Sequence, residues 1–469
     1  MTWTSRILAL AFAACAFGCR AGGNAARDGT SSSARPSAVV LVTVDTLRAD
    51  AVSFMGHEPA TTPFADSLAR KGVVFTRAYA TSSWTPPSVA SLVTSLAASS
   101  HGVVKGAILG SVGVRQPVLS GRLVTMAETF RRAGYRTIGA AANRHLEARL
   151  GFGQGFTAYF KEAAFEPADQ LNATAVRLLA RELGAGWEKS WKTARTFLWL
   201  HYFDPHDPYY PKGPWITAYA PDYREHPDDF PVRPITALVR EFPRPDESLR
   251  SCLEPLYESE VRFTDDQLGR LASRMGLIDP NVLVVFTADH GEEMGEHGGL
   301  GHGRNLYEEV VRVPLAFYWP AGLPQGLRID RPVSLLDVFP TVAELAGVAP
   351  PAGLQGTSLV PLMRGTASPE ERPVLMELHP PHGNHRAIVQ GRWKLIRPIV
   401  GDGKPVLYDL EADSKEKNDI ASARPDIVRD LAPKMDAIVR ALPQPPATKE
   451  VQLGSPEVEA QLRALGYIE

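Results

Sequence analysis

The 469-residue sequence has few cysteines, almost no net charge, and no apolar run near its start long enough to cross a membrane. Three cysteines, Cys15, Cys19 and Cys252, are too few for a disulfide framework. A net charge of −2 and a pI near 6.7 provide no basic field, so we expect no nucleic-acid partner. What the chain does have is 44% hydrophobic and 22% charged residues, which is ordinary for a globular protein with a large core.

The first 19 residues have the pattern of an export signal. Arg6 precedes an apolar run at 7–17 that is too short to span a bilayer. Small residues before Cys19 resemble a bacterial lipoprotein signal, although Phe17 is bulky for its position. We expect a signal peptide at 1–19, a lipid anchor at Cys19, a flexible tether at 20–37, and a periplasmic or cell-surface location; plain secretion and an uncleaved anchor are the alternatives.

Two apolar β-branched runs each lead into acidic residues. Residues 38–44 (AVVLVTV) precede Asp45, and residues 282–286 (VLVVF) run toward Asp289 and His290. Both runs suit strands buried on both faces of a parallel sheet. If both strands are central and parallel, Asp45 and Asp289 converge at one edge, where ligands bind in open α/β sheets. A carboxylate next to an imidazole there predicts a divalent-metal site.

A hydroxyl precedes a predicted helix in the stretch ATSSWTPPSVASLVTSL. We expect Ser88 to cap a helix running from Val89 toward Leu96, with Thr85 just before it. The unpaired N–H groups and the positive dipole end of such a helix favour an oxyanion and an anionic substrate.

Taken together, these motifs resemble the sulfatase family of the alkaline phosphatase superfamily over residues 38–469. The resemblance also includes SSHGV at 99–103, TMAETFRRAGYRTIGAAAN at 125–143, GFGQGF at 151–156, HYFDPHDPYYP at 201–211 and NLYEEVVRVPLAFYWP at 305–320. It implies an α/β sandwich like that of alkaline phosphatase, with a central, mostly parallel sheet flanked by helices. It also implies a catalytic domain at 38–365 and a small C-terminal α+β subdomain at 366–469, with a hairpin and a docking helix.

The resemblance implies a metal site and a nucleophile. Its metal ligands would be Asp45, Thr85, Asp289 and His290. An Asp-His pair in place of the Asp-Asn of calcium sulfatases favours Mn²⁺ or Zn²⁺, with Ca²⁺ or Mg²⁺ as alternatives and the number of ions open. Sulfatases carry a formylglycine made from cysteine at the position of Thr85, and an arginine at that of Val89.

Threonine changes the expected chemistry. Its single hydroxyl forms an ester that water must attack, and phosphorus accepts such an attack readily. Sulfatases often have a lysine at the position of His302, which would bind the anion or protonate the leaving group, with His206 as the second candidate for that proton. Arg48 and Asn143 are candidate substrate-binding residues. Arg48 would bind the anion, with a structural salt bridge as the alternative, and Asn143 would reach the site as a polar rim residue.

The expected function is that of a sulfatase-family, metal-dependent hydrolase of sulfuric or phosphoric esters. Thr85 would be its metal-activated nucleophile, and a phosphodiester- or phosphonate-type substrate is favoured. The alternatives are a true sulfuric ester hydrolase of arylsulfatase type, a phosphotransferase acting on a glycan or lipid acceptor, and a catalytically silent, lipid-tethered binding protein. The expected substrate is a small-molecule, glycan or lipid ester.

Overall fold

The computed structural model describes residues 35–104, 108–110, 113–160, 165–224, 234–242, 244–368 and 370–453. Residues 35–469 group into one compact unit. The predicted signal peptide, most of the tether and the predicted docking helix at 455–469 lie outside the described residues. Among those residues, no helix is both long enough and apolar enough to cross a membrane.

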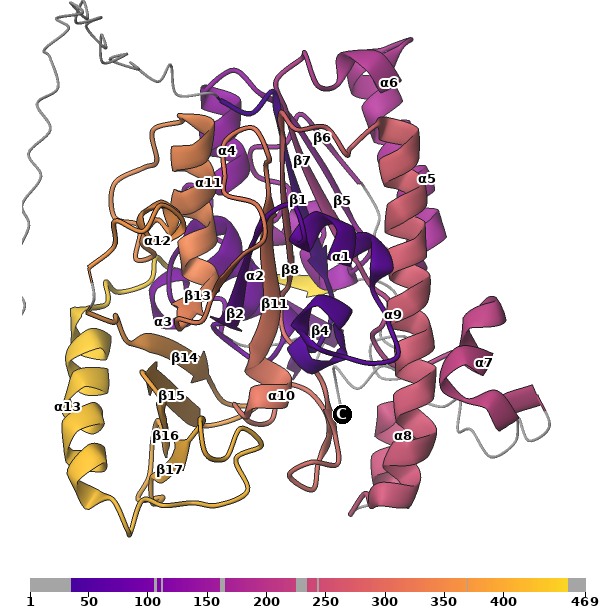
Figure 1. The fold of residues 1–469 in the computed structure, drawn as a ribbon. Helices are drawn as coiled ribbons and strands as arrows, with labels where there is room; N and C mark the ends of the chain where they lie inside the picture. The colour runs from indigo at the N-terminus through magenta and orange to yellow at the C-terminus, as the bar shows by residue number, and fades with distance from the viewer. Residues whose placement is uncertain are drawn as a thin grey trace, which may run out of the picture. The chain divides into compact units, whose positions relative to one another are not determined.

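A nine-stranded sheet forms the centre of the fold (Figure 1). Its strands follow the order β12-β2-β11-β8-β1-β7-β5-β6, with β13 also paired to β2. The strands are β1 (Ala38–Val44), β2 (Val73–Tyr79), β5 (Arg136–Ala141), β6 (Ala158–Tyr159), β7 (Thr196–Tyr202), β8 (Val282–Ala288), β11 (Arg312–Tyr318), β12 (Leu327–Ile329) and β13 (Val333–Ser334). Only β11 is antiparallel to its neighbours among the printed pairs of this sheet, so the sheet is mostly parallel, as predicted.

Strands β1 and β8 lie side by side at the middle of this sheet. They are parallel, with Val44 paired to Ala288, and every residue of both strands is buried. Burial on both faces explains why the two runs are apolar throughout rather than alternating. Because the strands end in register, Asp45 and Asp289 leave the sheet at the same edge, which confirms the predicted convergence.

Helices cover both faces of the sheet (Figure 1). On one side, α9 (Glu247–Met275) packs against α1 (Pro63–Ala69) and α5 (Ala168–Leu183). On the other side, α2 (Thr85–Thr94) packs against α4 (Met126–Arg132) and α11 (Val338–Ala346). The shorter helices are α3 (Ala98–His101), α6 (Trp187–Ser190), α7 (Ile216–Tyr219), α8 (Ile235–Glu241), α10 (Glu308–Val311) and α12 (Val360–Met363).

The segment 212–255 is rich in Pro, Asp and Arg with little periodicity, which is typical of a loop, yet it is partly helical. It contains α7 and α8, and α9 already begins at Glu247, where the Asp246 side chain accepts a hydrogen bond from the N–H of Leu249. The cap at Asp246 is a helix start signal that the Pro-rich composition of the segment obscured.

A second, antiparallel sheet lies in the C-terminal region. Its strands are β14 (Val374–Leu378), β15 (His385–Gln390), β16 (Trp393–Pro398) and β17 (Val406–Asp409), and α13 (Pro425–Ala441) packs on it through Leu431 and Met435. The predicted hairpin across Gly401–Gly403 is the antiparallel pair β16–β17. The expected small sheet with a packed helix is therefore confirmed.

Two further small sheets complete the structure. In one, β9 (Glu293–Met294) pairs with β10 (Leu300–Gly301) within the glycine-rich loop that follows β8. In the other, β18 (Glu450–Leu453) pairs with β4 (Gly113–Pro117), which also pairs with β3 (Ile108–Gly110). A strand near the C-terminus thus joins a hairpin that follows α3 early in the chain.

Candidate active site

Thr85 lies at the first residue of α2, beside the edge where β1 and β8 end. The helix begins at Thr85, four residues earlier than predicted, and accommodates Pro86 and Pro87 in its first turn, where proline needs no N–H partner. The predicted cap at Ser88 is therefore wrong: its hydroxyl instead donates to the backbone carbonyl of Asp289 at 2.6 Å. That bond fixes the start of α2 against the end of β8.

The four predicted metal ligands come together at this edge. One ligand atom from each of Asp45, Asp289 and His290 lies within 4.8 Å of the others. The Thr85 hydroxyl lies 3.4 Å from Asp45 Oδ1 and 3.3 Å from His290 Nε2. All four side chains are fully buried.

The chemistry of this cluster fits a cation. Asp289 Oδ2 is buried and has no hydrogen-bond partner among the described residues. Burial and the nearby charge of Asp45 raise the pKa of Asp289 well above its usual value. Two buried carboxylates this close are stabilised by a positive charge between them, and an ion bound there would reverse the shift.

The orientation of His290 suits a metal ligand. Its Nδ1 lies 2.9 Å from the carbonyl of Gly291, so Nδ1–H donates and Nε2 faces Thr85 and Asp45. Burial and the neighbouring His302 lower the pKa of His290 to about 3, which keeps the imidazole neutral. A neutral imidazole offers the lone pair that a metal ion requires.

Asn143 is buried against Asp45 rather than placed at the rim of the site. Its amide nitrogen donates to Asp45 Oδ2 at 2.6 Å, and its amide oxygen accepts from the backbone N–H of His145 at 2.9 Å. The side chain is fully buried. With both ends engaged, Asn143 orients the Asp45 carboxylate, and its predicted place at an exposed rim is wrong.

His302 and His206 lie next to the metal cluster. The ring centroid of His302 is 4.6 Å from that of His290 and 5.0 Å from that of His206. Nδ1 of His302 lies 2.8 Å from Glu292 Oε1, and Nδ1 of His206 lies 2.7 Å from the carbonyl of Asp207. The two predicted acid–base residues are therefore adjacent, and each is anchored through Nδ1.

The pKa values of the two histidines are shifted in opposite directions. Burial, followed by the charge of His206, lowers the pKa of His302 to about 4. Burial also lowers the pKa of His206, but the charges of Asp207, Asp45 and Glu292 outweigh burial and raise it above its ordinary value. His206 thus holds a proton at higher pH than His302 does.

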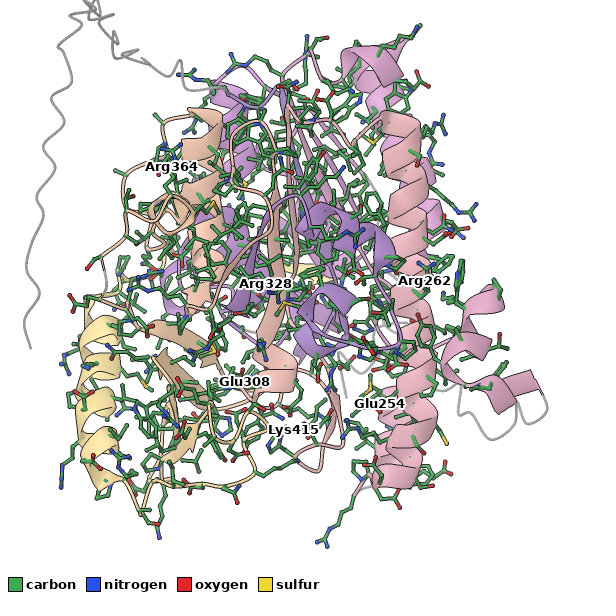
Figure 2. All side chains as sticks on the ribbon, in the orientation of Figure 1. Glu254, Arg262, Glu308, Arg328, Arg364 and Lys415 are labelled. Atoms are coloured by element: carbon green, nitrogen blue, oxygen red, sulfur yellow. The ribbon has the colours of Figure 1, made fainter. Side chains whose placement is uncertain are left out.

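Arg48 is engaged in ion pairs away from the cluster. Its guanidinium contacts Asp50 at 2.8 Å and Glu296 at 2.6 Å, and it donates to the carbonyl of Glu292 at 3.0 Å. It lines a cavity of about 130 Å³ whose other residues include Glu308 and Lys415, both labelled near α10 in Figure 2. These contacts favour the structural salt bridge over the predicted anion-binding role.

A second histidine–carboxylate group lies in the glycine-rich loop. Ligand atoms of Glu293, His297 and Glu309 lie within 4.8 Å of one another. His297 Nδ1 lies 2.7 Å from Glu309 Oε1, and its Nε2 lies 3.1 Å from the carbonyl of Glu416. Both ring nitrogens are hydrogen-bonded, so this group orders the loop and ties it to the C-terminal region.

The sequence analysis missed three buried residues around the site. Glu292 holds His302, His201 lies 3.4 Å from Asp45 Oδ2, and His145 Nδ1 lies 2.9 Å from Gln116 Oε1. The one available signal was at His201, a histidine in an otherwise apolar strand. Glu292 stands in a loop of many glutamates, where nothing in the sequence distinguishes the buried one.

The comparisons with known proteins agree with this geometry. The sulfatase family model matches residues 37–348, and the model of the C-terminal region of N-sulphoglucosamine sulphohydrolase matches residues 295–440. An uncharacterized sulfatase of Escherichia coli, YidJ, is 26% identical over 440 residues, spanning 82% of this chain and 83% of its own. Human arylsulfatase K is 32% identical over 203 residues, which span 40% of this chain and 37% of the human protein.

Solved structures show the same fold. The phosphonate monoester hydrolase of Agrobacterium radiobacter has a TM-score of 0.67 at 23% identity, covering 87% of this chain and 96% of its own. The protein BT4656, solved with its substrate D-glucosamine-2-N,6-O-disulfate, has a TM-score of 0.67 at 19% identity, covering 87% of this chain and 98% of its own. Fold and site thus define an ester-bond hydrolase of the alkaline phosphatase superfamily. The chain belongs to the sulfatase family.

Proposed function

We propose that this protein is a metal-dependent phosphoesterase of the sulfatase family that uses Thr85 as its nucleophile. The observation that carries the proposal is the position of the Thr85 hydroxyl, at the start of α2 and 3.3–3.4 Å from two metal-ligand candidates. A sulfatase nucleophile needs two hydroxyls on one carbon, and threonine has one. Phosphodiesters and phosphonate monoesters fit a nucleophile of this kind.

Asp45, Asp289 and His290 would hold the ion together with Thr85. When bound, the ion would lower the pKa of the Thr85 hydroxyl and polarise a non-bridging oxygen of the substrate. The neutral imidazole of His290 favours Mn²⁺ or Zn²⁺ over Ca²⁺, which prefers shells made of oxygen alone. Helix α2 adds the positive end of its dipole on the side where the anionic ester would lie, although Pro86 and Pro87 contribute no N–H groups there.

The reaction proceeds in two displacements. Thr85 Oγ attacks phosphorus, the bond to the leaving-group oxygen breaks, and His206 gives that oxygen a proton. Water then attacks the threonyl phosphate and gives one proton to His206, the bond from phosphorus to Thr85 Oγ breaks, and Thr85 leaves as the alkoxide that attacks in the next cycle. His302, anchored by Glu292 through Nδ1 and neutral, lies beside the transferred group and supplies no proton to the leaving oxygen. We assign the proton to His206 because its pKa is raised and that of His302 is lowered.

A panel of ester classes tests this proposal on protein loaded with Mn²⁺ or Zn²⁺. Bis-p-nitrophenyl phosphate and a p-nitrophenyl phosphonate should be hydrolysed faster than p-nitrophenyl sulfate. Thr85→Ala should lose about 10³-fold or more in kcat, and Thr85→Ser should retain activity because it keeps the hydroxyl. Equal or faster sulfate turnover would refute the phosphoester preference, and an active Thr85→Ala would remove Thr85 as the nucleophile.

A glycan or lipid ester is the natural substrate class that we propose, because BT4656 was solved with a sulfated sugar. The same first displacement would suit a phosphotransferase if an acceptor hydroxyl replaced water. Transfer to added glycerol or glucose, measured against hydrolysis in the same reaction, distinguishes the two. We also propose export and a lipid anchor at Cys19, on the basis of the signal pattern alone.

A further inference from the structure

A chain of hydrogen bonds runs through the core from Trp199 to the metal-ligand candidate Asp45. The Trp199 indole N–H lies 3.0 Å from Thr43 Oγ1, which lies 2.8 Å from His201 Nδ1. His201 Nε2 lies 3.4 Å from Asp45 Oδ2. Each of these side chains is at most 1% exposed, so water does not compete for the bonds.

The pairing of β1 with β7 builds this chain. The two strands are parallel, and Thr43 pairs with His201. Side chains two residues apart in a strand share a face, so Thr43 lies on the face of Asp45, and Trp199 on the face of His201. The same register that forms the sheet thus aligns all four groups.

The direction of the bonds follows from their donors. An indole N–H can only donate, so Thr43 Oγ1 accepts from Trp199 and has one proton of its own to give. That proton has two acceptors in reach, His201 Nδ1 at 2.8 Å and the carbonyl of Leu200 at 3.3 Å. The shorter contact favours the bond to His201 over the arrangement in which Thr43 donates to Leu200 and His201 Nδ1–H donates to Thr43. Nδ1 then accepts, and a neutral His201 carries its proton on Nε2, facing Asp45.

The two oxygens of Asp45 therefore have different surroundings. Oδ2 receives the Asn143 amide at 2.6 Å and the His201 Nε2–H at 3.4 Å. Oδ1 faces the Thr85 hydroxyl at 3.4 Å and His290 Nε2 at 3.6 Å. Two donors occupy Oδ2, on the side away from the metal cluster, whereas the neighbours of Oδ1 are Thr85 and His290, which are themselves metal-ligand candidates.

We propose that the Trp199–Thr43–His201 chain is a positioning device that, with Asn143, holds Asp45 Oδ2 so that Oδ1 alone is offered to the ion. As positioning residues, none of the three would contact the ion or the substrate. They act by fixing the tautomer of His201, and through it the rotation of the carboxylate. This inference rests on the metal site proposed above. Outer partners of this kind typically contribute 10- to 100-fold to metal affinity.

The test measures Mn²⁺ and Zn²⁺ binding by calorimetry on metal-depleted full-length protein, without substrate. Thr43→Val removes the hydroxyl that sets the tautomer, and Trp199→Phe removes the indole N–H that directs it. We expect both to weaken metal binding by about 10- to 100-fold. Thr43→Ser keeps the hydroxyl and should bind the ion as the wild type does.

Trp191→Phe is the matched control. Trp191 is as buried as Trp199, and its indole N–H donates to the carbonyl of Met275 at 2.8 Å, outside this chain of bonds. The Trp191→Phe variant should lose stability as Trp199→Phe does, but its metal affinity should match that of the wild type. Nitrogen-15 spectra of labelled histidine add a second readout: the Nε2–H tautomer of His201, assigned with His201→Gln, should dominate in the wild type and decline in Thr43→Val.

The outcomes separate this inference from the proposal it rests on. Unchanged affinity in Thr43→Val and Trp199→Phe, with normal wild-type binding, would overturn the positioning device and leave the metal site intact. The Nδ1–H tautomer in the wild type would overturn it as well. A wild-type protein that binds neither ion would refute the metal site, and the inference with it.

Discussion

The assignment of His206 as proton donor predicts that the cost of losing it depends on the leaving group. A nitrophenolate departs without protonation, whereas an alkoxide requires a proton in the transition state. His206→Asn should therefore lose about 10²- to 10⁴-fold in kcat on an alkyl phosphodiester, equivalent to about 2.7–5.4 kcal/mol. It should lose far less on bis-p-nitrophenyl phosphate.

The structure identifies the proton that His206 would transfer and supplies a control variant. Nδ1 of His206 is committed to the carbonyl of Asp207 at 2.7 Å, so the transferable proton is on Nε2. His302→Asn is the control, because His302 is held by Glu292 and its pKa is lowered to about 4, which leaves it uncharged. That variant should slow both substrates by a similar factor, since it removes a side chain beside the transferred group rather than the proton donor.

The direction of the pKa shift of His206 predicts how kcat changes with pH. The pKa of His206 is raised, so the acid form persists above pH 6.5, and kcat on the alkyl ester should fall as pH rises through that pKa. The falling limb should be absent in His206→Asn. The assay is steady-state release of alcohol and nitrophenol across pH 5–9, the interval that brackets an ordinary histidine pKa of about 6.5. Equal losses on both substrates in His206→Asn would refute the reasoning.

Two further predictions concern other parts of the chain. Lys394 is fully buried and lies 3.0 Å from both Glu308 and Glu416, so Lys394→Met should leave two carboxylates without a cation and lower the free energy of unfolding by about 3–5 kcal/mol, measured in urea. Lys434→Met, which removes a partly exposed lysine that pairs with Asp430, should change it by under about 1 kcal/mol. A loss below about 1 kcal/mol in Lys394→Met would show that the buried triad is not coupled to folding. Mass spectrometry of the membrane fraction should find an acylated N-terminal Cys19, and an N-terminus processed elsewhere would refute the lipid anchor.

What the sequence predicted well follows from burial and strand direction. A strand buried on both faces needs an unbroken apolar run, so β1 and β8 were visible, and the polar residues after them marked the edge. Parallel strands share their carboxyl ends, which brought Asp45 and Asp289 together without knowledge of the other strands. His290, next to Asp289, followed from adjacency alone.

The features of the site that the sequence did not predict depend on contacts between distant segments. A glutamate in a polar loop is usually solvated, and only the packing of the loop shows that Glu292 is buried against His302. Arg48 lies three residues after the metal-ligand candidate Asp45 in sequence, yet its ion pairs with Asp50 and Glu296 hold it elsewhere. The predicted start of α2 was too late because serine is a common N-cap residue, which made Ser88 the expected cap. The two prolines before it fit equally well inside the first turn.

The parallel pairing of β1 with β8 has a consequence for how the protein folds. The two carboxylates come from strands whose pairing joins residues 38–44 to residues 282–288, so their site does not exist until most of the central sheet has formed. An ion that needs both carboxylates has no comparable site in the unfolded chain, and its binding free energy adds to the stability of the completed sheet. Metal supply would then set the yield of folded protein as well as its activity, and a chain starved of metal would populate its unfolded state more.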